Sequence, residues 1–376
     1  MLITGNYPPQ QCGVGDYSYR LVESLRKKSV AIDVVTSQSA TTGEQVDESS
    51  AHVIRLRNFK NYPAILRLLK ERAVNIVHIQ FHAFAFREHS LVILLPLLLQ
   101  LRGIKVVTTV HELAGPKVIF LPRMVRRFLL LPLLLWSHKI IVTNEYYLRL
   151  LSRFFFFRRK LCYIPIAPNI CVYPDIDRAM VRASHGIKNE EIAVVRFGFV
   201  HNIVASFIPQ ILHALKIIKE KGYLVRLFFM GGVTSPDACS VRKLAKDLGI
   251  ASLVTLSEYC SERDISSFLS SADIAVQLYP EGAQEGRTGL MTVMAHGLAT
   301  VCMKKRPPPQ LFKHNENIVL ISHPVPENIA EAIEQLIRNP DLKARIGREA
   351  RVSLEPFTWD AVANQTRAAY ESLIGP

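Results

Sequence analysis

The sequence predicts an α/β protein of two domains, each built around a parallel β-sheet. At 376 residues the chain is too long for one compact core of ordinary size. Short, β-branched apolar runs alternate with helical patterns along most of its length, which is typical of βαβ units. A proline-rich turn at residues 164–169 separates two sets of such runs and suits an interdomain linker. We therefore expect a domain boundary near residue 170.

The expected strands are short apolar runs that suit a buried parallel sheet. In the first half they are Met1–Thr4, Ile32–Thr36, Ile76–Ile79, Lys105–Val110 and Lys139–Thr143. In the second half they are Ala193–Phe197, Leu224–Met230, Val254–Leu256, Ile274–Leu278, Thr300–Met303 and Ile318–Ile321. A final helix should run to Ile374, with Thr358 as its N-cap.

The net charge of +14 is concentrated in the first half of the chain. Residues 1–175 hold 23 basic and 11 acidic residues, and residues 100–160 alone hold 12 basic residues against Glu112 and Glu145. This distribution describes one patch and not a uniformly basic protein. No helix-turn-helix, zinc or RNA-binding signature accompanies it, so we expect no nucleic-acid partner.

The six cysteines are scattered, and no signal peptide is recognisable, which predicts free thiols in a reducing cytoplasm. The most apolar stretches, Leu91–Leu101 and Phe128–Trp136, fall short of the roughly 20 residues that span a bilayer.

The basic patch also contains clustered aromatic and aliphatic residues. Phe154–Phe157 precede Arg158, Arg159 and Lys160, and Arg123, Arg126 and Arg127 precede Phe128–Leu135. Such a surface would rest on an anionic leaflet, where each cation contributes about 1 kcal/mol. Alternatively, Leu129–Leu135 is a buried helix flanked by solvated arginines. We expect a cytoplasmic protein that is peripheral at the inner face of the membrane.

Three segments contain residue types that suit a ligand site. Gly13 and Gly15 open a helix after the first strand, and glycines there let a phosphate or sugar approach the backbone. His111 and Glu112 end a predicted strand. In 279–297, a glycine-rich loop enters a helix that Thr288 would cap, beside Arg287. Each segment has a plainer interpretation: a strand-to-helix turn, a loop histidine with a solvated carboxylate, and a capped surface loop.

Taken in order, these pieces resemble the family 4 glycosyltransferases of the GT-B fold. The matching segments are Tyr7–Tyr17, Val106–His111, Ile140–Thr143, Arg196–Gly198, Tyr279–Gly297 and Trp359 with the closing helix. The resemblance implies two Rossmann-like domains facing each other across a cleft, with a C-terminal helix that crosses back to the N-terminal domain. It assigns 1–170 to an acceptor- and membrane-facing domain, 171–356 to a nucleotide-sugar donor domain and 357–376 to the returning helix.

The resemblance further implies a retaining transfer of sugar from a nucleotide-sugar to a hydroxyl acceptor, in cell-surface polysaccharide or glycolipid synthesis. It requires no metal or other cofactor, and the partners are the donor and a glycan or lipid-linked acceptor. Catalytic roles fall on His111 and Arg287, and Asp16 and Glu112 lie on the acceptor side. The donor-binding residues would be Gly13, Gly15, Gly198, Gln284, Glu285, Gly286, Thr288, Gly289, Leu290 and Thr292.

Two departures from the family pattern bear on the donor site. The Arg and Lys that usually follow the glycine at Gly198 are absent, and Gln284 and Thr292 stand where the family has glutamates. We expect Arg287 to replace the lost cations, because a diphosphate bound without one would forfeit charge-assisted bonds of roughly 1.5–3 kcal/mol each. The alternative is an inactive relative that binds a glycan or a nucleotide.

Overall fold

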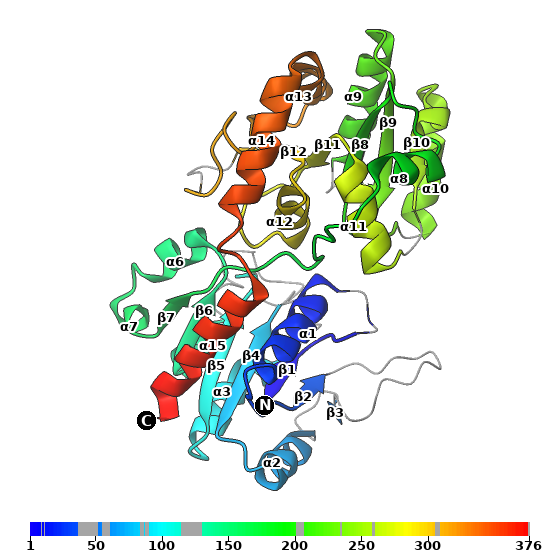
Figure 1. Cartoon of the computed structure of the whole chain (residues 1–376). Coiled ribbons are helices and arrows are strands. Elements are labelled where there is room, and N and C mark those ends of the chain that lie inside the picture. Colours follow the sequence, from blue (N-terminus) through cyan, green and yellow to red (C-terminus); the bar gives the residue numbers. More distant parts are fainter. Residues whose placement is uncertain are drawn as a thin grey trace. The chain divides into compact units, whose positions relative to one another are not determined.

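The computed structural model divides the chain into two compact units. It describes residues 1–8, 10, 12–36, 52–54, 61–82, 86, 90–113, 130–200, 207–233, 235–257, 260–304 and 309–374. The first unit combines Met1–Ala167 with Phe357–Pro376, and the second is Pro168–Pro356. Figure 1 shows the elements of both units.

Seven parallel strands form the sheet of the first unit, in the order β3-β2-β1-β4-β5-β6-β7. Their bounds are β1 Leu2–Thr4, β2 Val34–Thr36, β3 His52–Val53, β4 Ile76–Phe81, β5 Lys105–Val110, β6 Lys139–Val142 and β7 Leu161–Tyr163. The side chains of the inner strands are buried on both faces, as in a parallel sheet covered by helices. The five strands predicted in this half are confirmed, whereas the short β3 and β7 were not predicted.

The helices of the first unit include one from the far end of the sequence. Their bounds are α1 Gly13–Arg26, α2 Tyr62–Glu71, α3 Ser90–Gln100, α5 Leu131–Leu135, α6 Glu145–Leu151, α7 Phe155–Arg158 and α15 Trp359–Ile374. Figure 1 shows α15, in red, alongside the blue α1.

Helix α15 completes the first unit by packing on α1. The Thr358 hydroxyl oxygen accepts the Ala361 amide at 3.1 Å, which confirms the predicted cap. The Trp359 ring lies 5.2 Å from that of Tyr17, and Lys28 Nζ lies 2.5 Å from Asp360 Oδ1. The prediction that the terminal helix crosses back to the N-terminal domain is therefore confirmed.

The second unit contains six parallel strands in the order β10-β9-β8-β11-β12-β13. Their bounds are β8 Ile192–Phe197, β9 Val225–Met230, β10 Val254–Leu256, β11 Ile274–Gln277, β12 Ala299–Met303 and β13 Val319–Ile321. The helices are α8 Arg178–Ser184, α9 Ile208–Glu220, α10 Ser235–Asp247, the 3₁₀ turn η2 Ala251–Leu253, α11 Glu262–Ser271, α12 Thr288–Ala295, α13 Pro326–Arg338 and α14 Pro340–Ser353. All six predicted strands are confirmed.

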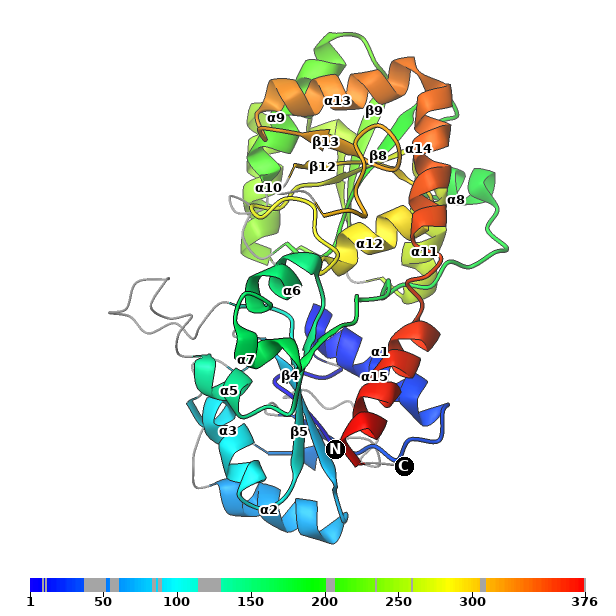
Figure 2. The same ribbon diagram turned by 90° about the vertical axis from the view of Figure 1, so that its left-hand side faces the viewer.

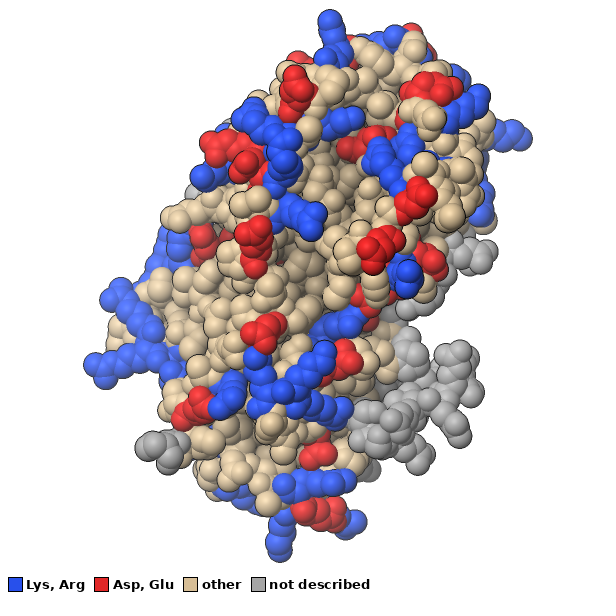
Figure 3. Space-filling view, in the orientation of Figure 1, with Lys and Arg blue, Asp and Glu red and all other residues tan. Residues whose placement is uncertain are grey.

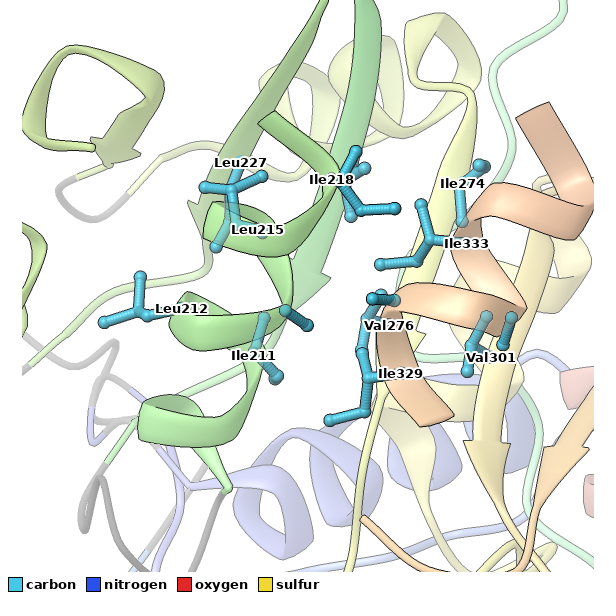
Figure 4. Close-up of a cluster of buried hydrophobic side chains, with 14 of the residues drawn as sticks. Ile211, Leu212, Leu215, Ile218, Leu227, Ile274, Val276, Val301, Ile329 and Ile333 are labelled. Carbon is cyan, nitrogen blue, oxygen red and sulfur yellow. The ribbon is translucent and has the colours of Figure 1, made fainter. Parts of the chain in front are cut away.

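Apolar side chains from helices and strands interlock in the core of the second unit. Helices α9 and α13 lie side by side over one face of the sheet (Figure 2). Ile211, Leu215 and Ile218 of α9 meet Ile329 and Ile333 of α13 above the strands (Figure 4). Each such side chain contributes about 1.5–3 kcal/mol through burial, which makes this sheet a rigid support for its loops.

Each sheet reverses its winding direction at one place. In the first, β1, β2 and β3 proceed toward one edge and β4 to β7 toward the other, so the switch point lies between β1 and β4. In the second it lies between β8 and β11. Open parallel sheets bind ligands outside the carboxyl ends of strands at such points. The segments that follow these four strands are therefore the places to look for a site.

Candidate functional site

The glycine segment after β1 brings the start of α1 close to the preceding loop. Gly13 and Asp16 lie in the first turn of α1. A Cβ on Gly15 would lie 3.3 Å from the carbonyl oxygen of Asn6, so a larger residue would push the helix away from the loop. The glycine thus has a packing role, in addition to the ligand contact predicted for it.

His111 follows β5 and is neutral near pH 7. Burial, reinforced by the charges of His82 and His78, lowers its pKa to about 3. Its ring lies edge-on to Tyr17 with centroids 4.8 Å apart. Nε2 donates to Gln80 Oε1 at 2.8 Å, because an amide oxygen can only accept. None of the described residues bonds to Nδ1, so this nitrogen is left as a hydrogen-bond acceptor.

Gln80 connects His111 to a buried polar network. Gln80 Nε2 donates to His78 Nε2 at 3.2 Å, and the Thr109 hydroxyl lies 2.7 Å from the same nitrogen. His78 Nδ1 therefore carries the proton and donates to the Tyr370 hydroxyl of α15 at 2.5 Å. This chain of bonds holds the His111 ring and its tautomer in place.

Sequence reasoning did not identify Gln80, His78 or Tyr370. The sequence did contain one indication of this network: His78 and Gln80 are polar residues two positions apart in an otherwise apolar strand, so they share a face of β4. Glu112, predicted on the acceptor side, lies with its Oε2 3.4 Å from His82 Nε2.

In the second unit, Gly198 follows β8 at the switch point in a conformation that favours glycine. Its φ is +108°, and a Cβ there would lie 3.1 Å from Nη1 of Arg196. Residues 201–206, where the family's cations were expected and not found, lie outside the described residues.

The loop after β11 orients Arg287 at the start of α12. The guanidinium lies 5.0 Å from the centre of the Tyr279 ring and is ion-paired with Glu281. The Tyr279 hydroxyl donates to Gln277 Oε1 at 3.1 Å and so fixes the ring. The Arg287 side chain is 39% exposed, which leaves it accessible to a ligand.

The predicted helix cap is wrong by one residue. Arg287 occupies the N-cap position with extended backbone angles, and Thr288 is the first residue of α12. Neither supplies a side-chain cap, because Arg287 has no acceptor and its guanidinium bonds Glu281.

The remaining predicted donor residues lie in the same loop and helix. Gln284 donates to the Glu281 carbonyl at 3.3 Å, and Gly286 lies in the turn that the Arg287 amide closes by bonding Gln284. A Cβ on Gly289 would lie 3.1 Å from the Tyr279 hydroxyl, so glycine permits α12 to approach that ring. The other three, Glu285, Leu290 and Thr292, are buried, and within the described part of the chain the Thr292 hydroxyl has no partner.

The basic patch separates into a buried and an exposed part. Leu133 and Leu134 of α5 are buried but Leu135 is 41% exposed, so the alternative interpretation of a buried helix holds for only part of this run. Phe154, Phe155 and Phe156 are 47%, 80% and 39% exposed. Residues 114–129, with Lys117, Arg123, Arg126, Arg127 and Phe128, lie outside the described residues. Across the described ranges, no helix combines the length and apolar character needed to cross a bilayer.

Two family models match the chain and together cover most of it. The model described as "Glycosyltransferase Family 4" matches residues 12–167, and "Glycosyl transferases group 1" matches residues 188–353. The chain is 26% identical to EpsD of Bacillus subtilis over 187 residues, which are 49% of this chain and 46% of EpsD. It is also 26% identical to the D-inositol 3-phosphate glycosyltransferase of Rhodococcus jostii, over 52% of this chain and 43% of the relative. The chain thus spans less than half the length of these curated relatives.

Solved structures match the fold over almost the whole chain. The sucrose-phosphate synthase of Thermosynechococcus elongatus has a TM-score of 0.78 at 17% identity, covering 99% of this chain and 98% of that one. Anabaena HepE, solved with UDP and glucose, has a TM-score of 0.77 at 12% identity with the same coverage. WaaG, of lipopolysaccharide biosynthesis, has a TM-score of 0.72 at 14% identity over 100% and 99% of the two chains. The chain therefore belongs to the family 4 glycosyltransferases and has the GT-B fold.

Proposed function

We propose that this protein is a retaining glycosyltransferase that moves a sugar from a nucleotide-sugar onto a hydroxyl acceptor. The observation that carries the proposal is Arg287, oriented by Tyr279 and Glu281 at the N-terminus of α12 beside the switch point of the second sheet. The first-turn amides of a helix and an accessible guanidinium suit a diphosphate. Among the structures with the same fold, HepE was solved with UDP and with UDP-glucose, which supports a nucleotide-sugar donor.

In this proposal, catalysis consists of positioning and charge stabilisation. Arg287 and the first turn of α12 stabilise the negative charge that develops on the departing diphosphate, and the departing phosphate accepts the acceptor's proton. Positive charge from the protein takes the place of a metal, so we propose that none is required. Gln284, Glu285 and Thr292 contact the nucleoside, where a neutral threonine would bind a ribose hydroxyl more weakly than a carboxylate.

The first unit contributes a neutral histidine. Because Nε2 of His111 is bonded to Gln80, Nδ1 accepts a hydrogen bond from a hydroxyl of the transferred sugar. Gly13 and Gly15 offer backbone contacts, and Asp16 and Glu112 bond acceptor hydroxyls. Histidine acts here as an orienting group and not as a base, because its conjugate acid is too strong near pH 7.

We also propose that the enzyme works at an anionic membrane surface, in cell-surface polysaccharide or glycolipid synthesis. The exposed Phe154, Phe155 and Phe156 stand next to Arg158 and Arg159 around α7. Basic side chains gather at the edge of the molecule where Figure 1 places α7 (Figure 3). Aromatic insertion combined with about 1 kcal/mol per nearby cation would hold the protein at the cytoplasmic leaflet.

Binding and transfer assays test the proposed activity. A panel of nucleoside diphosphates should produce a selective rise in melting temperature, and the matching nucleotide-sugar should give a product that proton NMR shows to retain the anomeric configuration. Transfer should persist in EDTA. Inversion would refute retention, and a protein that binds nucleotide without any transfer across an acceptor screen would favour the non-catalytic alternative.

Variants at Arg287 test its role. Arg287→Ala should raise the donor KM by roughly 10- to 150-fold, the loss of about 1.5–3 kcal/mol of charge-assisted bonding. The melting temperature should hardly change, because an exposed ion pair contributes about 0–1 kcal/mol. The matched control is Arg338→Ala, which removes an exposed arginine that pairs with Glu334 in the second unit and should leave kinetics unchanged. Unchanged kinetics in Arg287→Ala would remove this role.

A further inference from the structure

Arg196, near the end of β8, is a buried cation without a carboxylate partner. The residue is 5% exposed. Its Nη1 donates to the carbonyl oxygens of Phe197 and Gly198, and its buried Nε has no partner among the residues that the structure describes. Across the described residues no carboxylate bonds it.

A second buried arginine of the same unit shows the usual arrangement. Arg182 is also 5% exposed, and its Nη1 lies 3.0 Å from Asp273 Oδ2. It donates further to the carbonyl oxygens of Ser271, Lys188 and Glu191. Arg182 is thus neutralised and donates four hydrogen bonds, whereas Arg196 has no counter-charge among the described residues and leaves Nε unbonded. A buried charge left without a counter-charge destabilises a fold, so the arrangement around Arg196 calls for an anion.

The surroundings of Arg196 are positive and belong to the switch point. The Phe197 carbonyl that Arg196 bonds lies 3.3 Å from where a Cβ on Gly289 would stand, in the first turn of α12. Burial lowers the pKa of Arg196; the nearby Tyr279 hydroxyl opposes this shift, and the charge of Arg287 adds a smaller lowering. Glu281 bonds Arg287 and not Arg196. Two guanidinium groups and the positive end of a helix therefore converge here.

We propose that Arg196 is a second diphosphate-binding cation, which acts with Arg287 in place of the Arg and Lys absent after Gly198. This rests on the proposed function, because it assigns a residue to the donor site. A Cβ on Gly198 would lie 3.1 Å from Nη1 of Arg196, and one on Gly289 would lie 3.3 Å from the Phe197 carbonyl oxygen, so the two glycines allow the guanidinium, the end of β8 and the first turn of α12 to pack closely. Arg196 thus supplies a positive charge from a position before Gly198 in the sequence, whereas the family's usual cations follow this glycine.

The test compares Arg196→Met with Arg182→Met, using inorganic pyrophosphate and UDP, GDP and ADP as probes. Melting temperature and dissociation constants are measured on the full chain. Arg196→Met should melt no lower than the wild type, because an apolar side chain replaces an uncompensated charge. Its dissociation constant for pyrophosphate should rise roughly ten- to a hundredfold, the loss of a charge-assisted contact. Arg182→Met should melt lower, because Asp273 keeps Arg178 as a partner but loses its buried ion pair with Arg182, and the bonds of Arg182 to three carbonyl oxygens are lost as well. It should keep its pyrophosphate affinity.

The dissociation constant decides the outcome. An Arg196→Met protein that binds pyrophosphate as tightly as the wild type overturns this inference and leaves the proposed function intact. A wild type that binds neither pyrophosphate nor any of the three nucleotides overturns both. Should Arg196→Met fail to fold, Arg196→Lys replaces it, because it keeps the charge and loses the fork of donors. Several-fold weaker pyrophosphate binding is then expected, and unchanged binding refutes the inference.

Discussion

The stability of the first unit should depend on pH through His78, the buried histidine of the polar network. Burial lowers its pKa from the ordinary 6.5 to about 3. Below pH 6.5 the unfolded chain therefore binds a proton that the folded protein excludes. The stability contributed by neutral His78 is complete above pH 6.5 and is lost progressively as the pH falls toward 3.

The magnitude follows from the interval between pH 6.5 and the chosen pH. At pH 5 that interval is 1.5 units, which corresponds to about 2 kcal/mol at about 1.36 kcal/mol per unit. If the free energy of unfolding falls by about 2–3 kcal/mol per molar urea, this loss lowers the urea concentration at the unfolding midpoint by roughly 0.7–1 M.

Tryptophan fluorescence isolates this transition. The protein has two tryptophans, Trp136 and Trp359, and both lie in the first unit. Urea unfolding at pH 7.5 and pH 5 in wild type and His78→Asn gives the comparison. The variant will be less stable at both pH values, but its stability should change by about 2 kcal/mol less between them, because asparagine does not titrate. Equal pH dependence in the two proteins would refute the assignment of neutral, buried His78. His213→Asn, at an exposed histidine of the second unit, should behave as the wild type.

Two further predictions concern the proposed activity and its location. Gln80→Met should lower kcat about tenfold with little change in donor KM, and ¹⁵N NMR should show that His111 is no longer held in its single Nε2-protonated tautomer. The control is Thr109→Val, which removes only a contact of His78. An unaltered His111 tautomer in Gln80→Met would argue against Gln80 as a positioning residue. Phe155→Ser should reduce flotation with vesicles containing phosphatidylserine. The control Leu101→Ser changes a residue that is 72% exposed elsewhere in the first unit and should not reduce flotation. Equal flotation of both variants would show that α7 does not contact the membrane.

Strand and helix patterns in the sequence predicted most of the fold, because parallel strands are continuous apolar runs. The predicted bounds of β5 and β10 agree with the structure to the residue. Strand β3 was not predicted because it has only two residues, and β7 because its three residues, Leu161-Cys162-Tyr163, include no β-branched side chain. The order of the strands in each sheet depends on pairing between distant segments, which a single sequence does not display.

The site was only partly predictable, and the missed residues share a cause. The family pattern has its cations after the glycine at Gly198, whereas Arg196 precedes it inside a strand where an apolar residue is expected. The bond between His78 and Tyr370 joins residues 292 positions apart, so no local pattern reveals it. Arg287 was found because it stands in a glycine-rich loop before a helix, where short-range rules apply.

The inclusion of residues 357–376 in the first unit has a consequence for biosynthesis. While a ribosome is still translating the second unit, Tyr17 lacks Trp359 and His78 lacks Tyr370, so one flank of the first sheet is still uncovered. Because α15 follows the second unit in the sequence, this flank can close only after the whole second unit has been synthesised.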